Sequence, residues 1–315
     1  MKAMILAAGL GTRLRPLTDS RPKALVEING RTLLEITLAR LHTFGVNEVI
    51  INVHHFADMV ADYLKSHNNF GMRIEISRED DLLLDTGGGL KKASWFFLEG
   101  SRQESESQST EKKTRSVIPS EARNPGKMPT SPNNDQALRA SSNSDEPFLL
   151  HNVDVISTID LHRMLQFHNE HNALATLAVQ SRASSRLLLF NEKSQLVGRA
   201  PTGGTEAVEE PVIPNAVRDP GKIPARPKND QTTKASSPNA IRPLAFSGIH
   251  MLSPRLLPML TESGVFSIID AYLRLAAQGE KILAFRADEY YWRDLGRPAD
   301  LQQATLDLQQ QKILL

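Results

Sequence analysis

The chain opens with Lys2-Ala-Met-Ile-Leu-Ala-Ala-Gly-Leu-Gly-Thr-Arg13, and this stretch decides the fold. Its apolar run, ending at Ala8, predicts a short buried strand, and the glycines that follow predict a tight loop. Such a loop lets backbone N–H groups approach phosphate oxygens, and a helix start behind it adds partial positive charge. No Gly-Lys-Ser/Thr of a Walker A loop follows, and Leu14 stands where the dinucleotide fingerprint requires a third glycine. We therefore expect a phosphate-binding loop of another kind.

Apolar strands and amphipathic helices alternate along the rest of the chain. We predict strands at residues 2–8, 48–53, 72–77, 147–152, 173–180, 186–190 and 244–251, and helices at 32–44, 57–64, 90–97, 268–277 and 298–311. This order predicts an α/β fold with three layers: a Rossmann-like (GT-A-like) mixed but mostly parallel sheet with helices on both faces. Ligands of such sheets bind at the carboxyl ends of the strands.

Two segments of the chain repeat one another. The run Val117-Ile-Pro-Ser-Glu-Ala-Arg-Asn-Pro-Gly-Lys-Met-Pro129 returns as Val212-Ile-Pro-Asn-Ala-Val-Arg-Asp-Pro-Gly-Lys-Ile-Pro224. Both copies have a composition that buries too little apolar surface to offset the entropy of ordering. We interpret them as one duplicated element tolerated in two surface loops, with a pair of docking arms as the alternative. We therefore expect a single domain over residues 1–315, interrupted by disordered insertions at about 98–146 and 201–242.

Composition excludes several classes of protein. The chain has 315 residues, a net charge of +1, 40% hydrophobic residues and no cysteine. The balanced charge argues against nucleic acid and anionic membranes as partners. The absence of cysteine removes disulfides, thiolate metal sites and cysteine nucleophiles. The N-terminal apolar run is too short for a signal peptide, and no stretch of 18 apolar residues occurs, so we expect a cytoplasmic protein.

Basic residues accompany the glycine loop. Arg13 lies inside it, and Arg21-Pro-Lys23 follows close behind. A guanidinium and an ammonium group would there converge on one polyphosphate, whereas the alternative is an exposed basic turn. Further along, Asp85-Thr-Gly-Gly-Gly89 starts a predicted helix and suits reading of a nucleobase edge by backbone groups. A flexible turn is an equally good explanation of that glycine run.

Carboxylates and a glycine strand complete the candidate chemistry. In His151-Asn-Val-Asp154, a carboxylate follows a buried strand, where it could hold Mg²⁺ or merely cap a turn. Tyr291-Trp-Arg-Asp-Leu-Gly296 contains a second aspartate, Asp294. Phe246-Ser-Gly-Ile249 is a predicted strand that contains a glycine, and an ordinary core strand accounts for it.

Taken together, residues 6–18 and Arg21-Pro-Lys-Ala-Leu-Val26 resemble the signature of the sugar-1-phosphate nucleotidyltransferase (pyrophosphorylase) family, above all its short bacterial uridylyltransferases. The resemblance extends over nearly all of the chain outside the insertions. It implies a Mg²⁺-dependent enzyme that condenses a sugar 1-phosphate with a nucleoside triphosphate, UTP being favoured. The products would be pyrophosphate and a nucleotide sugar of the kind used in cell-wall synthesis.

The resemblance also implies roles for particular residues. Catalysis would fall to Arg13, Lys23 and Asp154, and Mg²⁺ would be held by Asp154 and Asp294. The nucleotide would be bound by Ala8, Gly9, Gly11, Thr12, Arg13, Lys23, Thr86, Gly87 and Gly88. The sugar phosphate would be bound by Asn152, Ser247 and Gly248. The chain departs from the family pattern at Asp85 (usually Glu), Val153 (usually Gly) and Arg297 (usually Thr).

No general base is needed for this reaction, because a phosphate monoester with a second pKa of about 6 is already mostly dianionic at pH 7. Two alternatives remain open. One is a nucleotidyltransferase with a non-sugar acceptor, such as phosphocholine or a precursor of the molybdenum cofactor. The other is a catalytically idle protein that binds nucleotide sugars. We expect a monomer or a homodimer.

Overall fold

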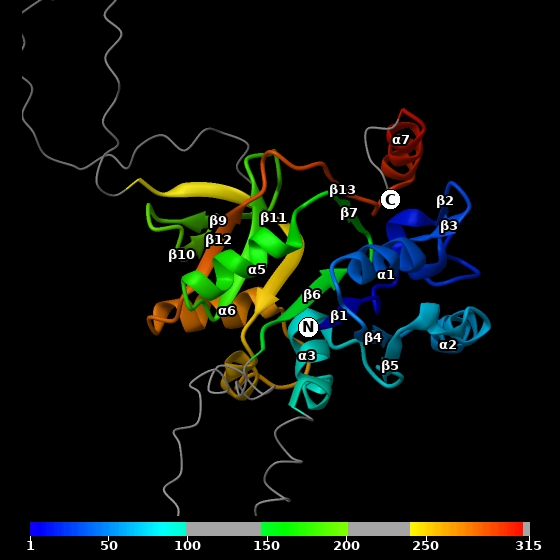
Figure 1. The fold of residues 1–315 in the computed structure, drawn as a ribbon, viewed down its shortest axis with the longest axis horizontal. Coiled ribbons are helices and arrows are strands. Elements are labelled where there is room, and N and C mark those ends of the chain that lie inside the picture. Colours follow the sequence, from blue (N-terminus) through cyan, green and yellow to red (C-terminus); the bar gives the residue numbers. More distant parts are fainter. Residues whose placement is uncertain (99–145, 201–239, 311–315) are drawn as a thin grey trace, which may run out of the picture.

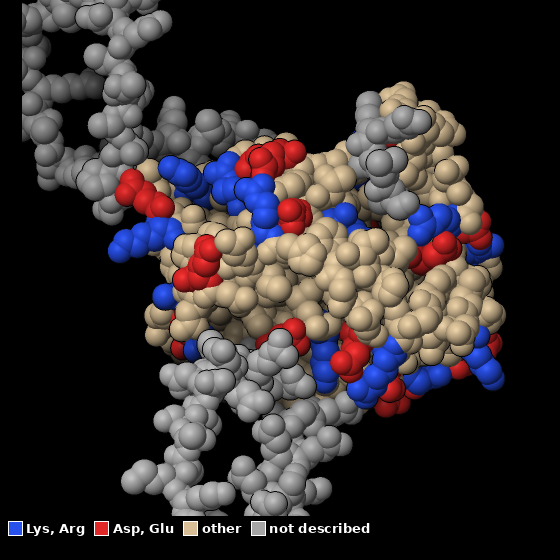
Figure 2. Space-filling view, in the orientation of Figure 1, with Lys and Arg blue, Asp and Glu red and all other residues tan. Residues whose placement is uncertain are grey.

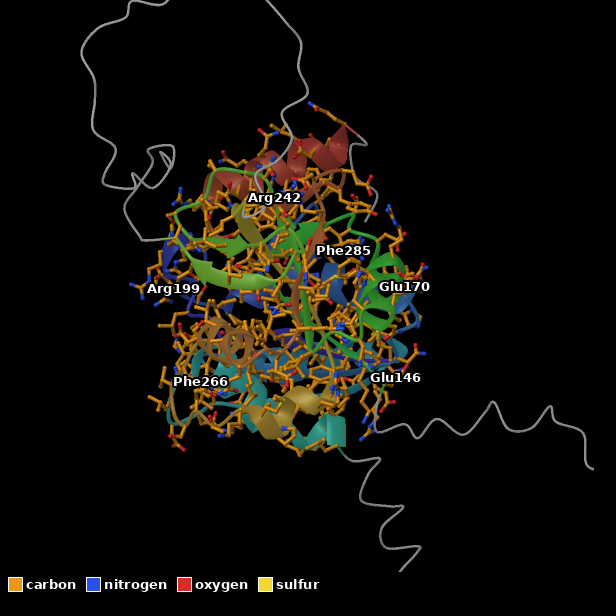
Figure 3. The ribbon with its side chains drawn as sticks, turned by 90° about the vertical axis from the view of Figure 1, so that its left-hand side faces the viewer. Glu146, Glu170, Arg199, Arg242, Phe266 and Phe285 are labelled. Atoms are coloured by element: carbon orange, nitrogen blue, oxygen red, sulfur yellow. The ribbon has the colours of Figure 1, made fainter. Side chains whose placement is uncertain are left out.

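The computed structural model describes residues 1–98, 146–200 and 240–310. The repeated segments, and most of both predicted insertions, lie outside the described residues. Glu146 and Arg242, near which the chain resumes after each gap, lie on different sides of the molecule (Figure 3). The second insertion was predicted to reach about residue 242, where the structure instead begins a strand.

A nine-stranded sheet forms the centre of the fold (Figure 1), in the order β10-β9-β11-β6-β1-β4-β5, with β8 paired to β11 and β12 paired to β8. Its strands are β1 (Lys2–Leu6), β4 (Glu48–Val53), β5 (Arg73–Arg78), β6 (Phe148–Asn152), β8 (Ala175–Gln180), β9 (Leu187–Phe190), β10 (Leu196–Arg199), β11 (Arg242–Leu252) and β12 (Ile282–Arg286). Only β10 and β11 run against the others in this sheet, and β6, β1, β4 and β5 form an all-parallel half. The predicted mixed, mostly parallel sheet is confirmed.

Helices cover both faces of the sheet. On one face lie α1 (Leu33–Thr43), α2 (Ala57–Ser66), α5 (Leu161–Glu170) and α7 (Pro298–Gln309), whose apolar residues share a core with β1, β4 and β6. On the other face, α3 (Asp85–Lys92) and α6 (Ile268–Ala277) cover a second core. Short 3-10 turns lie at Thr12–Leu14 (η1), Lys23–Leu25 (η2), Asn68–Gly71 (η3) and Pro254–Met259 (η4).

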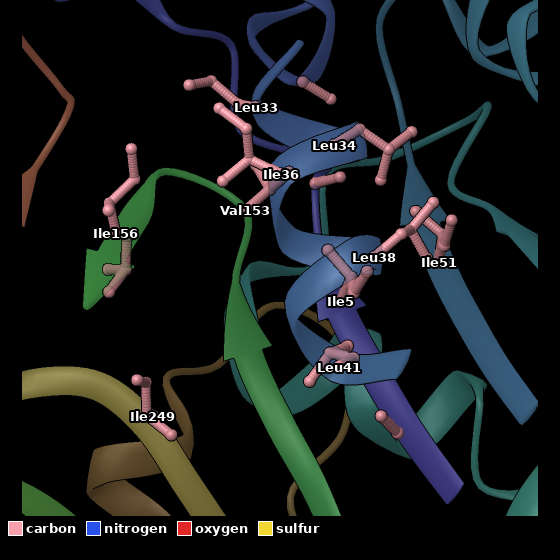
Figure 4. Close-up of a cluster of buried hydrophobic side chains, with 14 of the residues drawn as sticks. Ile5, Leu33, Leu34, Ile36, Leu38, Leu41, Ile51, Val153, Ile156 and Ile249 are labelled. Carbon is pink, nitrogen blue, oxygen red and sulfur yellow. The ribbon is translucent and has the colours of Figure 1, made fainter. Parts of the chain in front are cut away.

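Helix α1 shows how local sequence and packing agree. Thr32 precedes it, and its side chain accepts a hydrogen bond from the Glu35 N–H, as an N-cap should. Leu34, Leu38 and Leu41 then recur at helical spacing and are fully buried against the parallel strands (Figure 4). The helix ends before Gly45, whose φ of +77° favours glycine.

Two small antiparallel ribbons flank the main sheet. The first joins β2 (Glu27–Ile28) to β3 (Arg31–Thr32). The second joins β7 (Val155–Ser157) to β13 (Trp292–Asp294), with Asp294 opposite Val155. The second ribbon matters for function because it brings the end of the chain to the carboxyl end of β6.

Several elements differ from the sequence prediction. Helix α3 begins at Asp85 and ends at Lys92, so the glycine run starts a helix as predicted. Residues 95–98 of the helix expected at 90–97 form a separate helical turn. Helix α5 was not predicted, although Leu161, Met164 and His168 recur at helical spacing behind the N-cap Asp160. Strands β7, β10, β12 and β13 were also missed, since strands of three to five residues carry little periodicity of their own.

Acidic and basic side chains are intermingled on the face shown in Figure 2, with no basic stripe across it. Within the described ranges, every helix is too short or too polar to cross a bilayer.

Candidate active site

A cavity of about 390 Å³ opens at the carboxyl ends of β1, β4 and β6. Its lining comes from segments far apart in the chain and includes Ala8, Gly9, Lys23, Asn52, Asp85, Thr86, Asn152, Val153 and Asp154. This is the edge at which an α/β sheet presents its ligand site. The glycine loop, Lys23 and Asp154 were predicted from separate stretches of the sequence, and all three line this one cavity.

The glycine loop is folded tightly back on Lys23. Gly11 adopts φ of +65°, and a Cβ there would lie 2.9 Å from Thr18 Cγ2 and 3.2 Å from Lys23 Cβ. The Thr18 hydroxyl donates to the Gly11 carbonyl at 2.9 Å. Only glycine combines this conformation with this close approach. Gly9, in contrast, has open space where its Cβ would be.

Lys23 and Asp154 form a hydrogen-bonded ion pair within the cavity. Lys23 starts η2, and its Nζ donates to Asp154 Oδ2. The lysine side chain is 10% exposed and the aspartate side chain 18% exposed. Since Coulomb interactions strengthen away from water, the ammonium group is held at a fixed place beside the carboxylate.

Asp294 reaches the same place from the other end of the chain. The β7–β13 ribbon lays β13 beside Asp154, and the Leu295 N–H donates to the Asp154 carbonyl at 2.8 Å. A Cβ at Gly296 would lie 2.6 Å from Arg13 Nη2 and 2.8 Å from Asp294 Oδ1. Gly296 therefore leaves the space in which the Arg13 guanidinium and the Asp294 carboxylate come together.

Asp294 is held in an unfavourable electrostatic position. Its Oδ1 is buried and has no hydrogen-bond partner among the described residues. Burial and the neighbouring Asp154 raise the pKa of Asp294, and Lys23 and Arg13 oppose the shift. Two nearby carboxylates, one with a free oxygen, are the donor set that Mg²⁺ takes together with substrate phosphates. The described residues contain no group of three or more His, Cys, Asp or Glu side chains suited to a metal.

A buried polar pair that the sequence reading overlooked ties the parallel strands together. Asn52 Oδ1 accepts from the Ala7 N–H at 2.8 Å, and its Nδ2 donates to Glu79 Oε1 at 2.7 Å. Glu79 Oε2 accepts from the Leu84 N–H at 2.9 Å. The pair thus links the loop after β1 to the segment before α3. The sequence contains a signal for this pair, because Asn52 is near the carboxyl end of β4 and Glu79 directly follows β5, at the edge where ligands bind.

The three glycines of α3 serve close packing. The N–H groups of Gly87 and Gly88 both point to the Phe266 carbonyl, at 3.0 and 3.3 Å. A Cβ at Gly87 would lie 2.3 Å from the Phe266 ring, and one at Gly89 would lie 2.8 Å from Asn52 Nδ2 and from Glu79 Oε1. Asp85 and Thr86 line the cavity, whereas Gly87 and Gly88 do not. Contact of Gly87 and Gly88 with a nucleotide stays a prediction.

A second cavity, of about 650 Å³, adjoins the first and shares Asp85, Thr86 and Asn152 with it. Arg186, Arg199, Phe246 and His250 contribute to the rest of its wall. Arg199 and Phe266 lie on this side of the molecule (Figure 3).

The strand β11 bends beside Asn152. Its register with β8 shifts between Phe246 and His250. Gly248 adopts φ of +74°, and a Cβ there would lie 2.9 Å from Asn152 Nδ2. The Ser247 hydroxyl is buried and has no partner among the described residues. Of the three residues expected to bind a sugar phosphate, Asn152 lines both cavities, whereas Ser247 and Gly248 are buried beside it and line neither.

Two departures from the family pattern have simple structural settings. The Val153 side chain belongs to the hydrophobic core beneath the cavity, where it packs near α1 (Figure 4). Arg297 is exposed and forms the N-cap of α7. Val153 thus lines the cavity while its side chain stays buried, and Arg297 does not line the cavity.

The sheet and its site define an α/β protein with the nucleotidyltransferase fold. The chain aligns with a putative glucose-1-phosphate thymidylyltransferase from Bacillus anthracis, solved with a sucrose, at a TM-score of 0.63 and 14% identity, over 100% of this chain and 97% of that one. Residues 2–105 match the family model described as nucleotidyl transferase. That match covers the first third of the chain, and the likeness to the solved structure extends over the whole fold.

Two curated relatives share about half of their residues with this chain over short matched stretches. An N-acetylmuramate alpha-1-phosphate uridylyltransferase of Caulobacter vibrioides is 50% identical over 100 residues, which are 31% of this chain and 41% of that protein. A choline-phosphate cytidylyltransferase of Streptococcus pneumoniae is 49% identical over 74 residues, 24% of this chain and 31% of that protein. The matched part thus spans less than half the length of either relative.

Proposed function

We propose that the protein transfers a nucleotidyl group from a nucleoside triphosphate to a sugar 1-phosphate. The observation that carries the proposal is the convergence of Lys23, Asp154, Asp294 and Arg13 beside a glycine loop at the carboxyl edge of the sheet. Two cations and two carboxylates at one strand edge suit the joining of two anions, whose repulsion is the main obstacle to the reaction.

In the proposed reaction, an oxygen of the sugar 1-phosphate attacks the α-phosphorus of the triphosphate. A new P–O bond forms, the bond from the α-phosphorus to the bridging oxygen breaks, and its electrons leave with pyrophosphate. We assign Lys23 to the α-phosphate, and Arg13 with the loop amides to the β and γ phosphates. No proton has to be removed from the nucleophile at pH 7.

Asp154 and Asp294 are the residues that would hold Mg²⁺. The fit rests on their closeness and on the buried, unpartnered Oδ1 of Asp294. When bound, the ion would neutralise negative charge on the phosphates and help to orient them. Lys23, already paired with Asp154, would stay within reach of the same phosphate.

The choice of substrates is the finer part of the proposal. We favour UTP, on the Thr86-Gly-Gly-Gly89 pattern and the uridylyltransferase relative from Caulobacter. N-acetylmuramate 1-phosphate is the first acceptor to test, for the same reason. The similarity to the Streptococcus choline-phosphate enzyme makes phosphocholine with CTP the competing pair.

A matrix of triphosphates against acceptors, with release of pyrophosphate as the readout, tests the proposal. The acceptors are N-acetylmuramate 1-phosphate, glucose 1-phosphate and phosphocholine, each with and without Mg²⁺. We expect turnover with a sugar 1-phosphate, abolished by EDTA. Turnover with phosphocholine alone would overturn the sugar assignment, and nucleotide binding with no turnover would identify an idle binding protein.

A further inference from the structure

Arg182 lies near Asp294 and has no role in the proposed transfer reaction. Arg182 follows β8, and its guanidinium lies 3.6 Å from the centre of the Trp292 ring. Its Nη2 donates to the Phe246 carbonyl at 2.7 Å. The Trp292 Nε1–H in turn donates to the Ser247 carbonyl at 2.7 Å. Arginine and tryptophan thus hold the bend of β11 that carries Gly248 against Asn152.

Arg182 is partly removed from water without a paired anion. Its Nε is buried and has no hydrogen-bond partner, and it makes no ion pair with any described residue. Burial lowers the pKa of Arg182, while the negative charge of Asp294 opposes that shift. A desolvated cation is costly unless an anion approaches it, and stacking on an indole ring offsets only part of the cost.

The position of Arg182 complements those of Arg13 and Lys23. Those two approach the aspartates from the loop after β1, which is the side assigned to the triphosphate. Arg182 lines neither cavity itself, but it donates to the carbonyl of Phe246, which lines the second cavity. It is also near enough to Asp294 to be influenced by that carboxylate's charge.

The three residues predicted to bind the acceptor phosphate, Asn152, Ser247 and Gly248, carry no charge. Arg186 and Arg199 line the second cavity, but both are exposed and Arg199 is paired with Asp270. Arg182 is therefore the partly buried cation on this side of the site.

We propose that Arg182, stacked on Trp292 and fixed by the Phe246 carbonyl, is the anchor for the phosphate of the acceptor. The geometry leaves guanidinium N–H groups free for phosphate oxygens while one face of the group stays against the indole ring. The proposal rests on the proposed function, since it presupposes an acceptor with a phosphate group. It deepens that function by naming the cation that offsets the charge of the nucleophile.

The test separates the KM of the acceptor from the KM of the triphosphate. The variants are Arg182→Gln, which keeps the length but loses the charge, Arg182→Lys and Arg182→Ala, with Arg163→Gln as the control. Arg163 is an exposed arginine on α5 that pairs with Glu289, away from the cavity. The acceptor is whichever of N-acetylmuramate 1-phosphate and glucose 1-phosphate the unaltered protein turns over.

We expect Arg182→Gln to raise the KM of the acceptor about 10- to 100-fold, the loss of one charged hydrogen-bonding group. The KM of the triphosphate should change by less than about threefold, Arg182→Lys should lie in between, and free guanidinium should partly restore Arg182→Ala. A lowered melting temperature with an unchanged acceptor KM, or an equal rise in both KM values, would overturn the anchor. If Arg182→Gln does not fold, the same comparison of the acceptor KM with the triphosphate KM is made on Arg182→Lys, and an unchanged acceptor KM there overturns the anchor.

The anchor and the proposed function fail in different ways. If the unaltered protein turns over no phosphate acceptor, the proposed function is wrong and the anchor falls with it. If the unaltered protein is active but Arg182→Gln has the same acceptor KM, only the anchor is wrong.

Discussion

Asp294 is the residue whose position is hardest to justify by stability alone. Its Oδ1 is buried with no partner among the described residues, and Asp154, a second carboxylate, lies close to it. An isolated polar atom of this kind costs about 1–3 kcal/mol, and a charged one costs more. We infer that the arrangement serves a ligand, because the free protein would be more stable without that charge.

The substitution Asp294→Asn tests this inference. We expect pyrophosphate release to fall at least about 100-fold, because one of the two carboxylates assigned to Mg²⁺ is lost. The melting temperature in EDTA should stay level or rise by a few degrees, because the repulsion from Asp154 is removed. The control is Asp58→Asn, an exposed carboxylate on α2. Full activity of Asp294→Asn would refute the metal assignment.

Among the elements, α3 depends most on residues that lack a side chain. Its first turns pack so tightly on the segment before α6 that a Cβ at Gly88 would lie 2.5 Å from the Gly264 carbonyl oxygen. The Ile268 N–H donates to the Thr86 hydroxyl at 3.0 Å, which joins the starts of α3 and α6. The glycine run therefore fixes the rim that the two cavities share.

Gly88→Ala should destabilise the protein even though alanine is the better helix former. The gain in helix propensity is about 1 kcal/mol, whereas an inserted methyl group that meets backbone costs about 1–3 kcal/mol. We expect a melting temperature lower by a few degrees and a raised KM for the triphosphate. Gly198→Ala in β10 is the matched control, since the nearest atom to its Cβ would be at an ordinary 3.6 Å. Equal melting temperatures for the two variants would contradict the packing argument.

At the scale of the whole molecule, buried histidines on both faces of the sheet set the response to acid. Burial lowers the pKa of His168 to about 4, helped by Arg255, and lowers that of His250 to about 3, helped by His151. Each is hydrogen-bonded through Nδ1, to the Thr176 and Tyr272 hydroxyls respectively. Below pH 6.5 these histidines are protonated in the unfolded chain but remain neutral in the folded protein, so the free energy of unfolding decreases as the pH falls toward 4.

Urea unfolding between pH 8 and pH 4.5 measures this loss. The pKa of His168 is lowered from 6.5 to about 4 by folding. Once the pH is below both values, this difference lowers the free energy of unfolding by up to about 3 kcal/mol. His168→Gln should flatten the decline with pH, and His162→Gln, an exposed neighbour on α5, should not. Identical pH dependence in the two variants would show that His168 does not contribute.

Local patterns in the sequence were sufficient to predict the class of fold. Three features are local patterns that can be recognised in the sequence alone: the strand followed by Gly9 and Gly11, the alternation of strands and helices, and Lys23 after the loop. The parallel half of the sheet and helix α1 were predicted for that reason. The ligand edge followed from the rule that such sheets bind at strand ends.

Which distant residues come into contact depends on tertiary packing. The pairing of β13 with β7 brings Asp294 to Asp154, the shifted register of β11 brings Gly248 to Asn152, and packing on Phe266 explains Gly87. Arg182 belongs to no recognisable motif, since what distinguishes it is its contact with the Trp292 ring and its buried Nε, which has no hydrogen-bond partner among the described residues. Such contacts depend on strand register and burial, which arise from the whole chain packing at once and leave no periodic signal in the sequence.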